Sequence, residues 1–226
     1  MRSESLWARL ALAAAIVGGV SYLAADYLPL TVAAGLAWKG SGVGLLAVYA
    51  ALRARSFDGW LLAAVMALGA AGDVLLGAAG FVVGGGMFLL GHLVAIWLYL
   101  RNRRPGLSRG DWVSGLLLIP ATVTAAWLLP ADRAGAAGVA AYALGLSAMA
   151  ASAGLSRFPR GRVALGALMF LVSDLLIFAR AGPLAGQATA VVGFLVWSLY
   201  FAGQALICLG VTRTLAADEV QRAAPK

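Results

Sequence analysis

Residues 59–78 read GWLLAAVMALGAAGDVLLGA, and residues 81–100 read FVVGGGMFLLGHLVAIWLYL. Asp73 is the only Asp, Glu, His, Lys or Arg residue in the first stretch, and His92 is the only one in the second. A helix needs about 20 mainly apolar residues to span the hydrocarbon core of a bilayer. Both stretches are therefore predicted to be transmembrane helices, joined by a connection of two residues.

The rest of the chain follows the same pattern. Six further apolar stretches are long enough to span a membrane, at about residues 6–25, 29–51, 112–129, 135–154, 162–180 and 187–211. We expect an all-α membrane protein, with eight transmembrane helices in one bundle and a single transmembrane domain over residues 1–226. Only 12% of the 226 residues are charged and 62% are hydrophobic, whereas a soluble domain has about 25% charged residues. This composition excludes a soluble enzyme, a disordered chain and a nucleic-acid-binding domain.

The basic residues predict the orientation of the helices, because cytoplasmic loops of membrane proteins are rich in Lys and Arg. Of 17 basic residues, Arg133 and Arg180 fall on one side of the predicted membrane and Lys39 falls within a helix, which leaves 14 on the other side. Both termini are therefore expected to be cytoplasmic. The net charge of +8 marks topology and does not indicate a nucleic-acid partner.

Four ionisable side chains remain inside predicted spans: Lys39, Asp73, His92 and Asp174. A charge at the bilayer centre costs about 2.5–3.5 kcal/mol on insertion scales, so such residues are rare and often functional. From the rise per residue of a helix, both carboxyl groups should lie roughly 8–9 Å below the outer edge of the apolar zone. Lys39 and His92 should lie roughly 15 Å and 17 Å deep.

Other polar residues fall at similar depths, namely Tyr142, Ser173, Tyr200 and Gln204. We expect these side chains and the four ionisable groups to share a partly hydrated cavity in the outer half of the bundle, because each would be costly to bury alone. A structural role is the alternative, especially for Lys39 and His92. The glycines at 69, 72 and 84–86 are expected to be close-packing surfaces between helices.

Four short sequence motifs, in this order and in a chain with eight predicted helices, resemble the YhhN-like lysoplasmalogenase family of membrane proteins. They are GDVLL at residues 72–76, FLLGHL at 88–93, GALMFLVSD at 166–174 and YFAGQALI at 200–207. The resemblance covers roughly residues 30–210. One position departs from the family pattern, since Lys39 is followed by Gly40 where the family usually has proline.

The resemblance implies hydrolysis of the vinyl ether bond of lysoplasmalogens, giving a fatty aldehyde and a glycerophosphoethanolamine or glycerophosphocholine. This chemistry protonates the β-carbon of the vinyl ether, and water captures the resulting oxocarbenium ion. It needs one protonated carboxylic acid and a second carboxylate, as in glycoside hydrolysis. Asp73 and Asp174 fit these roles, with either as the acid. His92, Tyr142, Ser173, Tyr200 and Gln204 would position or tune them, and Lys39 would bind phosphate or pair with one Asp.

The main alternative is a transporter of lipids or small molecules, because buried Asp, His and Lys also form proton relays. Asp73 and Asp174 are 101 residues apart on helices of the same direction, and such repeats occur in transporters. An intramembrane aspartyl protease is disfavoured because AAGD replaces the required GxGD at residues 70–73. One His and one Cys cannot build a zinc site.

The remaining expectations concern the surroundings of the protein. No cofactor and no metal are expected, and the partners are a lysophospholipid substrate and membrane lipids. The predominance of Arg over Lys suggests a bacterial protein of the inner membrane. The oligomeric state is left open.

Overall fold

The structure, a computed structural model, describes residues 5–187 and 189–223. The protein is 85% helical, and the described residues form no β-strand. Within them, eight helices are long and apolar enough to span a membrane. The α-helices in them are α1 Leu6–Ser21, α2 Val32–Arg53, α3 Phe57–Ala78, α4 Phe81–Arg101, α5 Arg109–Leu128, α6 Arg133–Leu155, α7 Leu165–Arg180 and α8 Thr189–Ala223. The first and seventh spans, Leu6–Ala25 and Arg160–Arg180, also include the short helical segments next to α1 and α7. The predicted all-α membrane fold is confirmed.

Two short helical segments and one long extension distinguish the structure from the predicted spans. A 3₁₀ segment, Tyr22–Tyr27, follows α1, and a π-helical turn, Arg160–Ala164, leads into α7. Helix α8 continues to Ala223, although its apolar stretch was predicted to end at residue 211. The additional residues contain Ala, Leu, Glu and Arg, which favour helix, and no Gly or Pro that would end it.

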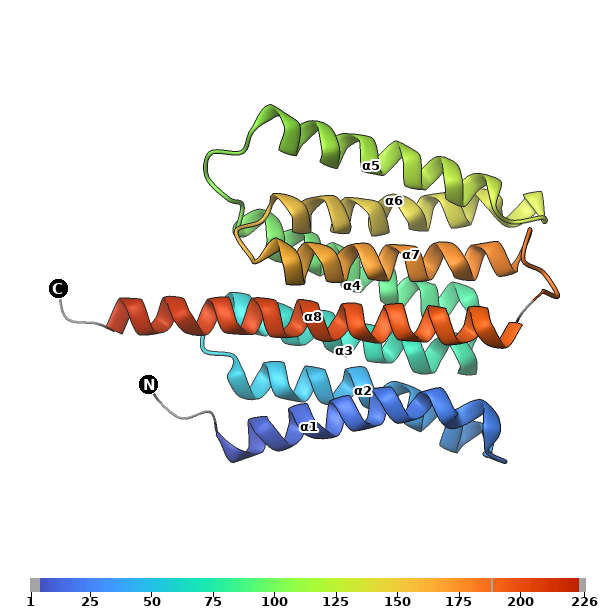
Figure 1. Ribbon diagram of the computed structural model, residues 1–226, viewed down its shortest axis with the longest axis horizontal. Helices are drawn as coiled ribbons and strands as arrows, with labels where there is room; N and C mark the ends of the chain where they lie inside the picture. The colour runs from blue at the N-terminus through green and yellow to red at the C-terminus, as the bar shows by residue number, and fades with distance from the viewer. Residues whose placement is uncertain (1–4, 188, 224–226) are drawn as a thin grey trace.

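The helices run approximately parallel and antiparallel to one another (Figure 1). Consecutive helices pack together in the pairs α1–α2, α2–α3, α3–α4, α5–α6 and α7–α8, and α4 also packs on α6. Helix α8 contacts α1, α2 and α3 as well as α7. The last helix of the chain therefore lies against the first half of the bundle and can bring its side chains to α3.

Local signals set the helix starts. The hydroxyls of Ser5, Thr31 and Ser56 each accept a hydrogen bond from the backbone N–H three residues later, which satisfies one free donor of the helix that follows. The short connection between α3 and α4 contains Gly80 with φ of 84°. This left-handed conformation is accessible to glycine without steric cost, and it allows α4 to reverse direction directly after α3.

Glycine also allows α7 and α8 to touch through their backbones. A Cβ atom placed on Gly166 would lie 2.5 Å from the Gly203 carbonyl oxygen, and one on Gly203 would lie 2.6 Å from the Gly166 carbonyl oxygen. Small residues at such crossings are typical of membrane helix packing. This crossing fixes how closely α8 packs against α7, the helix that carries Asp174.

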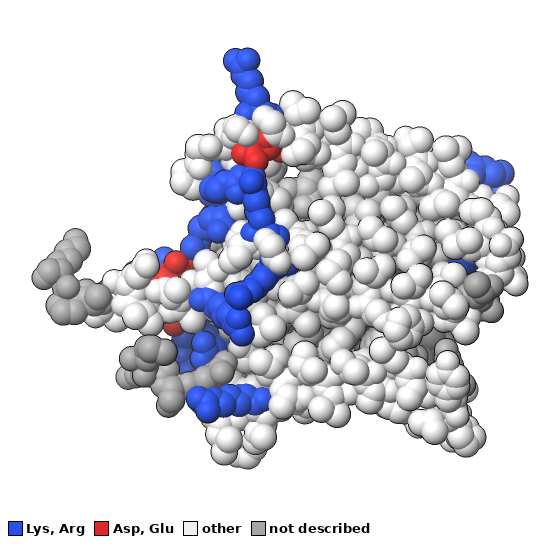
Figure 2. All heavy atoms as spheres, viewed as in Figure 1, with Lys and Arg blue, Asp and Glu red and all other residues white. Residues whose placement is uncertain are grey.

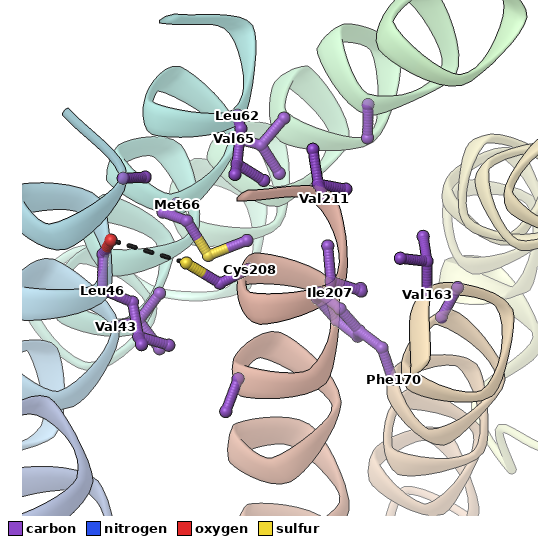
Figure 3. Close-up of a cluster of buried hydrophobic side chains, with 14 of the residues drawn as sticks. Val43, Leu46, Leu62, Val65, Met66, Val163, Phe170, Ile207, Cys208 and Val211 are labelled. Atoms are coloured by element: carbon purple, nitrogen blue, oxygen red, sulfur yellow. Dashed lines mark hydrogen bonds between the residues drawn. The ribbon is translucent and has the colours of Figure 1, made fainter. Parts of the chain in front are cut away.

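A buried apolar cluster surrounds the middle of α8 (Figure 3). Cys208 faces Leu46 of α2 and Met66 of α3, and its thiol donates to the Leu46 carbonyl oxygen at 3.7 Å. Ile207 lies on the opposite side of α8, toward Phe170 of α7. Because α8 is packed from both sides, it connects the α2–α3 half of the bundle to α7.

Basic residues gather at one end of the bundle, the end where α1 begins and α8 ends, and we call it the arginine-rich end (Figure 2). Arg133 begins α6 and Arg180 ends α7, so both lie at the opposite, arginine-poor end. Arg2 and Lys226 are outside the described residues. The assignment of the arginine-rich end to the cytoplasm stays a prediction from the positive-inside rule.

A polar network holds the loops together at the arginine-rich end. Asp58 accepts hydrogen bonds from Arg101 and Asn102, both at 2.9 Å. Asn102 accepts one from Arg157, and Arg157 forms a two-pronged ion pair with Asp218 on the extension of α8. The α8 extension is thus tied to the connections that follow α4 and α6.

Candidate active site

Asp73 lies on α3 with only 2% of its surface exposed. The hydroxyl of Tyr200, on α8, donates a hydrogen bond to its Oδ2 at 2.7 Å. The Gln204 side chain, one turn further along α8, lies next to the Tyr200 hydroxyl. Gly69 makes room for this pair, because a Cβ atom there would lie 3.0 Å from the Gln204 amide nitrogen. Asp73, Tyr200 and Gln204 therefore form one buried polar group between α3 and α8.

Asp174 lies on α7 and is 7% exposed. The hydroxyl of Tyr142, on α6, donates to Asp174 Oδ2 at 2.6 Å, and His92 Nε2 on α4 lies 3.1 Å from the same hydroxyl. Because a tyrosine hydroxyl has one proton, this geometry places the proton of His92 on Nε2, from which it is donated to Tyr142. His92, Tyr142 and Asp174 thus form a chain of hydrogen bonds across three helices.

Aromatic rings lie between the two polar groups and contact both. The Phe170 ring centre lies 5.0 Å from that of Tyr200 and 5.1 Å from that of His92. Phe88 contacts both Phe170 and Tyr200 edge to face. The carboxyl groups on the two sides of this aromatic wall lie close enough for their charges to interact. The structure therefore brings the two predicted acids into one neighbourhood.

Two of the predicted residues have different surroundings. Lys39 lies within electrostatic range of Asp73 and does not line the cavity next to Asp174. The Ser173 hydroxyl donates to the backbone carbonyl of Val196 at 2.9 Å, so it joins α7 to α8 and does not bond either acid. Ser173 was predicted to belong to the site because it is polar and lies at a similar depth to Asp174, but consecutive helical residues point in different directions.

A cavity of about 490 Å³ lies beside Asp174, toward the arginine-poor end. Asp174 and Tyr142 line it, together with side chains that are almost all apolar from α4, α6, α7 and the end of α3. Asp73, His92, Tyr200 and Gln204 do not line it. Of the residues expected to share one cavity, Asp174 and Tyr142 therefore border this one together, and the other predicted residues are not part of its lining.

Sequence reasoning missed the phenylalanines of this wall, although helical spacing could have found them. Phe88 lies four residues before His92, and Phe170 lies four residues before Asp174. Residues with this separation share a helix face. The apolar character of phenylalanine made both residues resemble ordinary core positions.

Nowhere in residues 5–187 and 189–223 do three His, Cys, Asp or Glu side chains lie together as a metal site would require. The chemistry available at the site is that of two carboxyl groups, each bonded to a tyrosine, one of which borders an apolar cavity.

Comparison with known protein families identifies the family of this chain. Residues 34–211 match the model of the YhhN family, and this range includes both acids, His92 and both tyrosines of the site. No curated protein and no solved structure matches the chain significantly. The matched range covers well over half of the chain, so the protein belongs to the YhhN family of lysoplasmalogenase-like multi-pass membrane proteins.

Proposed function

We propose that the protein is an enzyme that hydrolyses the vinyl ether bond of lysoplasmalogens, with Asp174 as the group that meets the substrate. The observation that supports this proposal is the position of Asp174: it is the acid that lines the apolar cavity, and a second acid lies within electrostatic range. Membership of the YhhN family supports the same reaction class.

The two acids differ in their neighbours, and this difference suggests their roles. Asp73 has the Lys39 ammonium within electrostatic range, so Asp73 is the better site for a permanent negative charge. Asp174 is bonded to the neutral Tyr142 hydroxyl, and among the described residues no cation pairs with it. We therefore assign the protonated acid to Asp174 and the charged carboxylate to Asp73.

The reaction proceeds in three steps with one water molecule consumed. Asp174 transfers its proton to the β-carbon of the vinyl ether, which leaves an oxocarbenium ion and a carboxylate on Asp174. Water then adds to the carbon bonded to oxygen and returns a proton to Asp174. Asp174 thus acts first as an acid and then as a base, as the acid residue of a retaining glycosidase does. The hemiacetal collapses to a fatty aldehyde and the free glycerophospho-head group. The negative charge of Asp73 stabilises the cation throughout.

Location agrees with this substrate. The cavity is lined by membrane-spanning helices, so a single-chain lipid can reach Asp174 directly from the bilayer. We propose further that the protein resides in a bacterial inner membrane with its arginine-rich end in the cytoplasm, which places the cavity in the outer leaflet.

The test is release of fatty aldehyde from lysoplasmalogen by purified protein in nanodiscs. Asp174→Asn is expected to lose about 10²–10⁴-fold in rate, the usual contribution of a positioned general acid. Asp73→Asn is expected to lose less, because it acts through charge. Asp218→Asn, at the arginine-rich end, is the matched control and should keep the wild-type rate. A folded Asp174→Asn protein with wild-type aldehyde release would exclude this mechanism, and a wild type that releases no aldehyde would favour the transporter alternative.

A further inference from the structure

The cavity beside Asp174 has the dimensions and the lining of a site for an apolar ligand. Its volume of about 490 Å³ falls within the range of roughly 300–1,000 Å³ of small-molecule sites. Along α4 its lining runs from Phe81 to Leu89, and along α6 from Gly135 to Tyr142. At 1.5 Å per residue the cavity is thus about 10–12 Å long, and Asp174 lies at its inner end.

Three glycines in the lining leave space that no protein atom fills. A Cβ atom on Gly85, Gly86 or Gly138 would find nothing within 4 Å. The neighbouring Gly84 is different, since a Cβ atom there would lie 2.4 Å from the backbone nitrogen of Leu76. The predicted close packing is therefore right for Gly84 and wrong for Gly85 and Gly86. Helix packing does not require glycine at these three positions, and its effect there is to keep the cavity wide.

The polar groups of the cavity lie at its inner end. Asp174 and Tyr142 are there, and most of the other lining side chains are apolar. Arg133 and Arg180 are at the same end of the bundle but are not part of the lining. A cavity with this lining is complementary to a hydrocarbon chain with a polar group near the acid.

We infer that this cavity binds the hydrocarbon chain of a single-chain phospholipid where the chain joins the head group, and that Gly85, Gly86 and Gly138 determine which chains it accepts. This inference rests on the proposed function, because it places the chain of the same substrate. Asp174 lines the same cavity, so the first atoms of the bound chain, where the vinyl ether bond lies, are beside this acid.

The test measures binding without chemistry. The probe is a saturated 1-O-alkyl lysophosphocholine, which has no vinyl ether to hydrolyse, and binding to the full-length protein in nanodiscs is followed by native mass spectrometry or by thermal stabilisation. Gly138→Leu and Gly86→Leu are expected to weaken binding at least tenfold by filling the cavity. Gly138→Ala, which adds one methyl group, is expected to give a smaller loss and serves if the leucine variants do not fold.

Gly193→Leu is the matched control. Gly193 lies on α8 outside the cavity lining, and a Cβ atom there also finds nothing within 4 Å, so binding should equal that of the wild type. Wild-type affinity in the folded cavity variants would overturn the inference, as would equal losses in the control or a wild type that does not bind the probe. If the wild type binds the probe and the cavity variants do not, but no aldehyde is formed from lysoplasmalogen, the proposed function fails and the chain site stands.

Discussion

Replacing Tyr142 by phenylalanine removes the hydrogen bond that Asp174 accepts at 2.6 Å and keeps the ring in place. As Asp174 gives up its proton, its oxygens become negative and the bond from Tyr142 becomes a charge-assisted one. Hydrogen bonds to charged groups contribute about 1.5–3 kcal/mol, and each 1.36 kcal/mol of barrier changes a rate tenfold. Tyr142→Phe should therefore lower kcat by about 10- to 150-fold, with a smaller change in KM.

The same substitution also affects stability, because it removes the acceptor of the buried His92 ring nitrogen. A buried donor without a partner costs about 1–3 kcal/mol, so the variant should unfold more easily by that amount.

The assay is initial-rate release of aldehyde from lysoplasmalogen, with unfolding followed in detergent. Tyr99→Phe is the control. Tyr99 is a buried tyrosine of α4 that lies toward the arginine-rich end, against Phe158. The reasoning is refuted if Tyr142→Phe retains the wild-type kcat while Asp174→Asn abolishes activity.

Three further predictions concern residues outside the reacting groups. Asp218→Asn should lower the free energy of unfolding in detergent by no more than about 1 kcal/mol, because its ion pair with Arg157 is partly exposed; a loss of several kcal/mol would contradict this. Gly203→Val should abolish accumulation of folded protein on size-exclusion chromatography, because its side chain would collide with the Gly166 carbonyl oxygen, and normal yield would show that the crossing is not needed. Ser173→Ala should keep aldehyde release within about twofold of wild type, since the hydroxyl bonds a backbone carbonyl of α8; a tenfold loss would return Ser173 to the site.

Most of the fold could be predicted from the sequence because the requirements for spanning a bilayer apply to each segment of the chain separately. Segment length, mean hydropathy and the alternation of arginines locate each helix without knowledge of its neighbours. The prediction failed at the end of α8, which continues to Ala223, because hydropathy detects where a helix leaves the membrane and not where the helix ends.

The candidate site could be predicted only in its list of polar residues. The cost of burying a charge pointed to Asp73 and Asp174, but pairing depends on helix rotation, which no local pattern fixes. Thus the sequence did not show that Tyr200 bonds Asp73 and Tyr142 bonds Asp174. It also did not show that only one acid borders the cavity, because that depends on which helices separate at the arginine-poor end.

The partner of Asp73 comes from the last helix of the chain, and this has a consequence for biogenesis. Helices are synthesised from the N-terminus onward, so α3 enters the membrane with Asp73 before Tyr200 of α8 has been made. Until α8 arrives, the acid lacks its hydrogen bond from Tyr200, and the indole of Trp197 has not yet reached its acceptor, the Gly19 carbonyl oxygen at 2.7 Å. A chain that stops before α8 therefore keeps Asp73 in the membrane without this hydrogen bond, a feature by which membrane quality control can distinguish an incomplete molecule from a finished one.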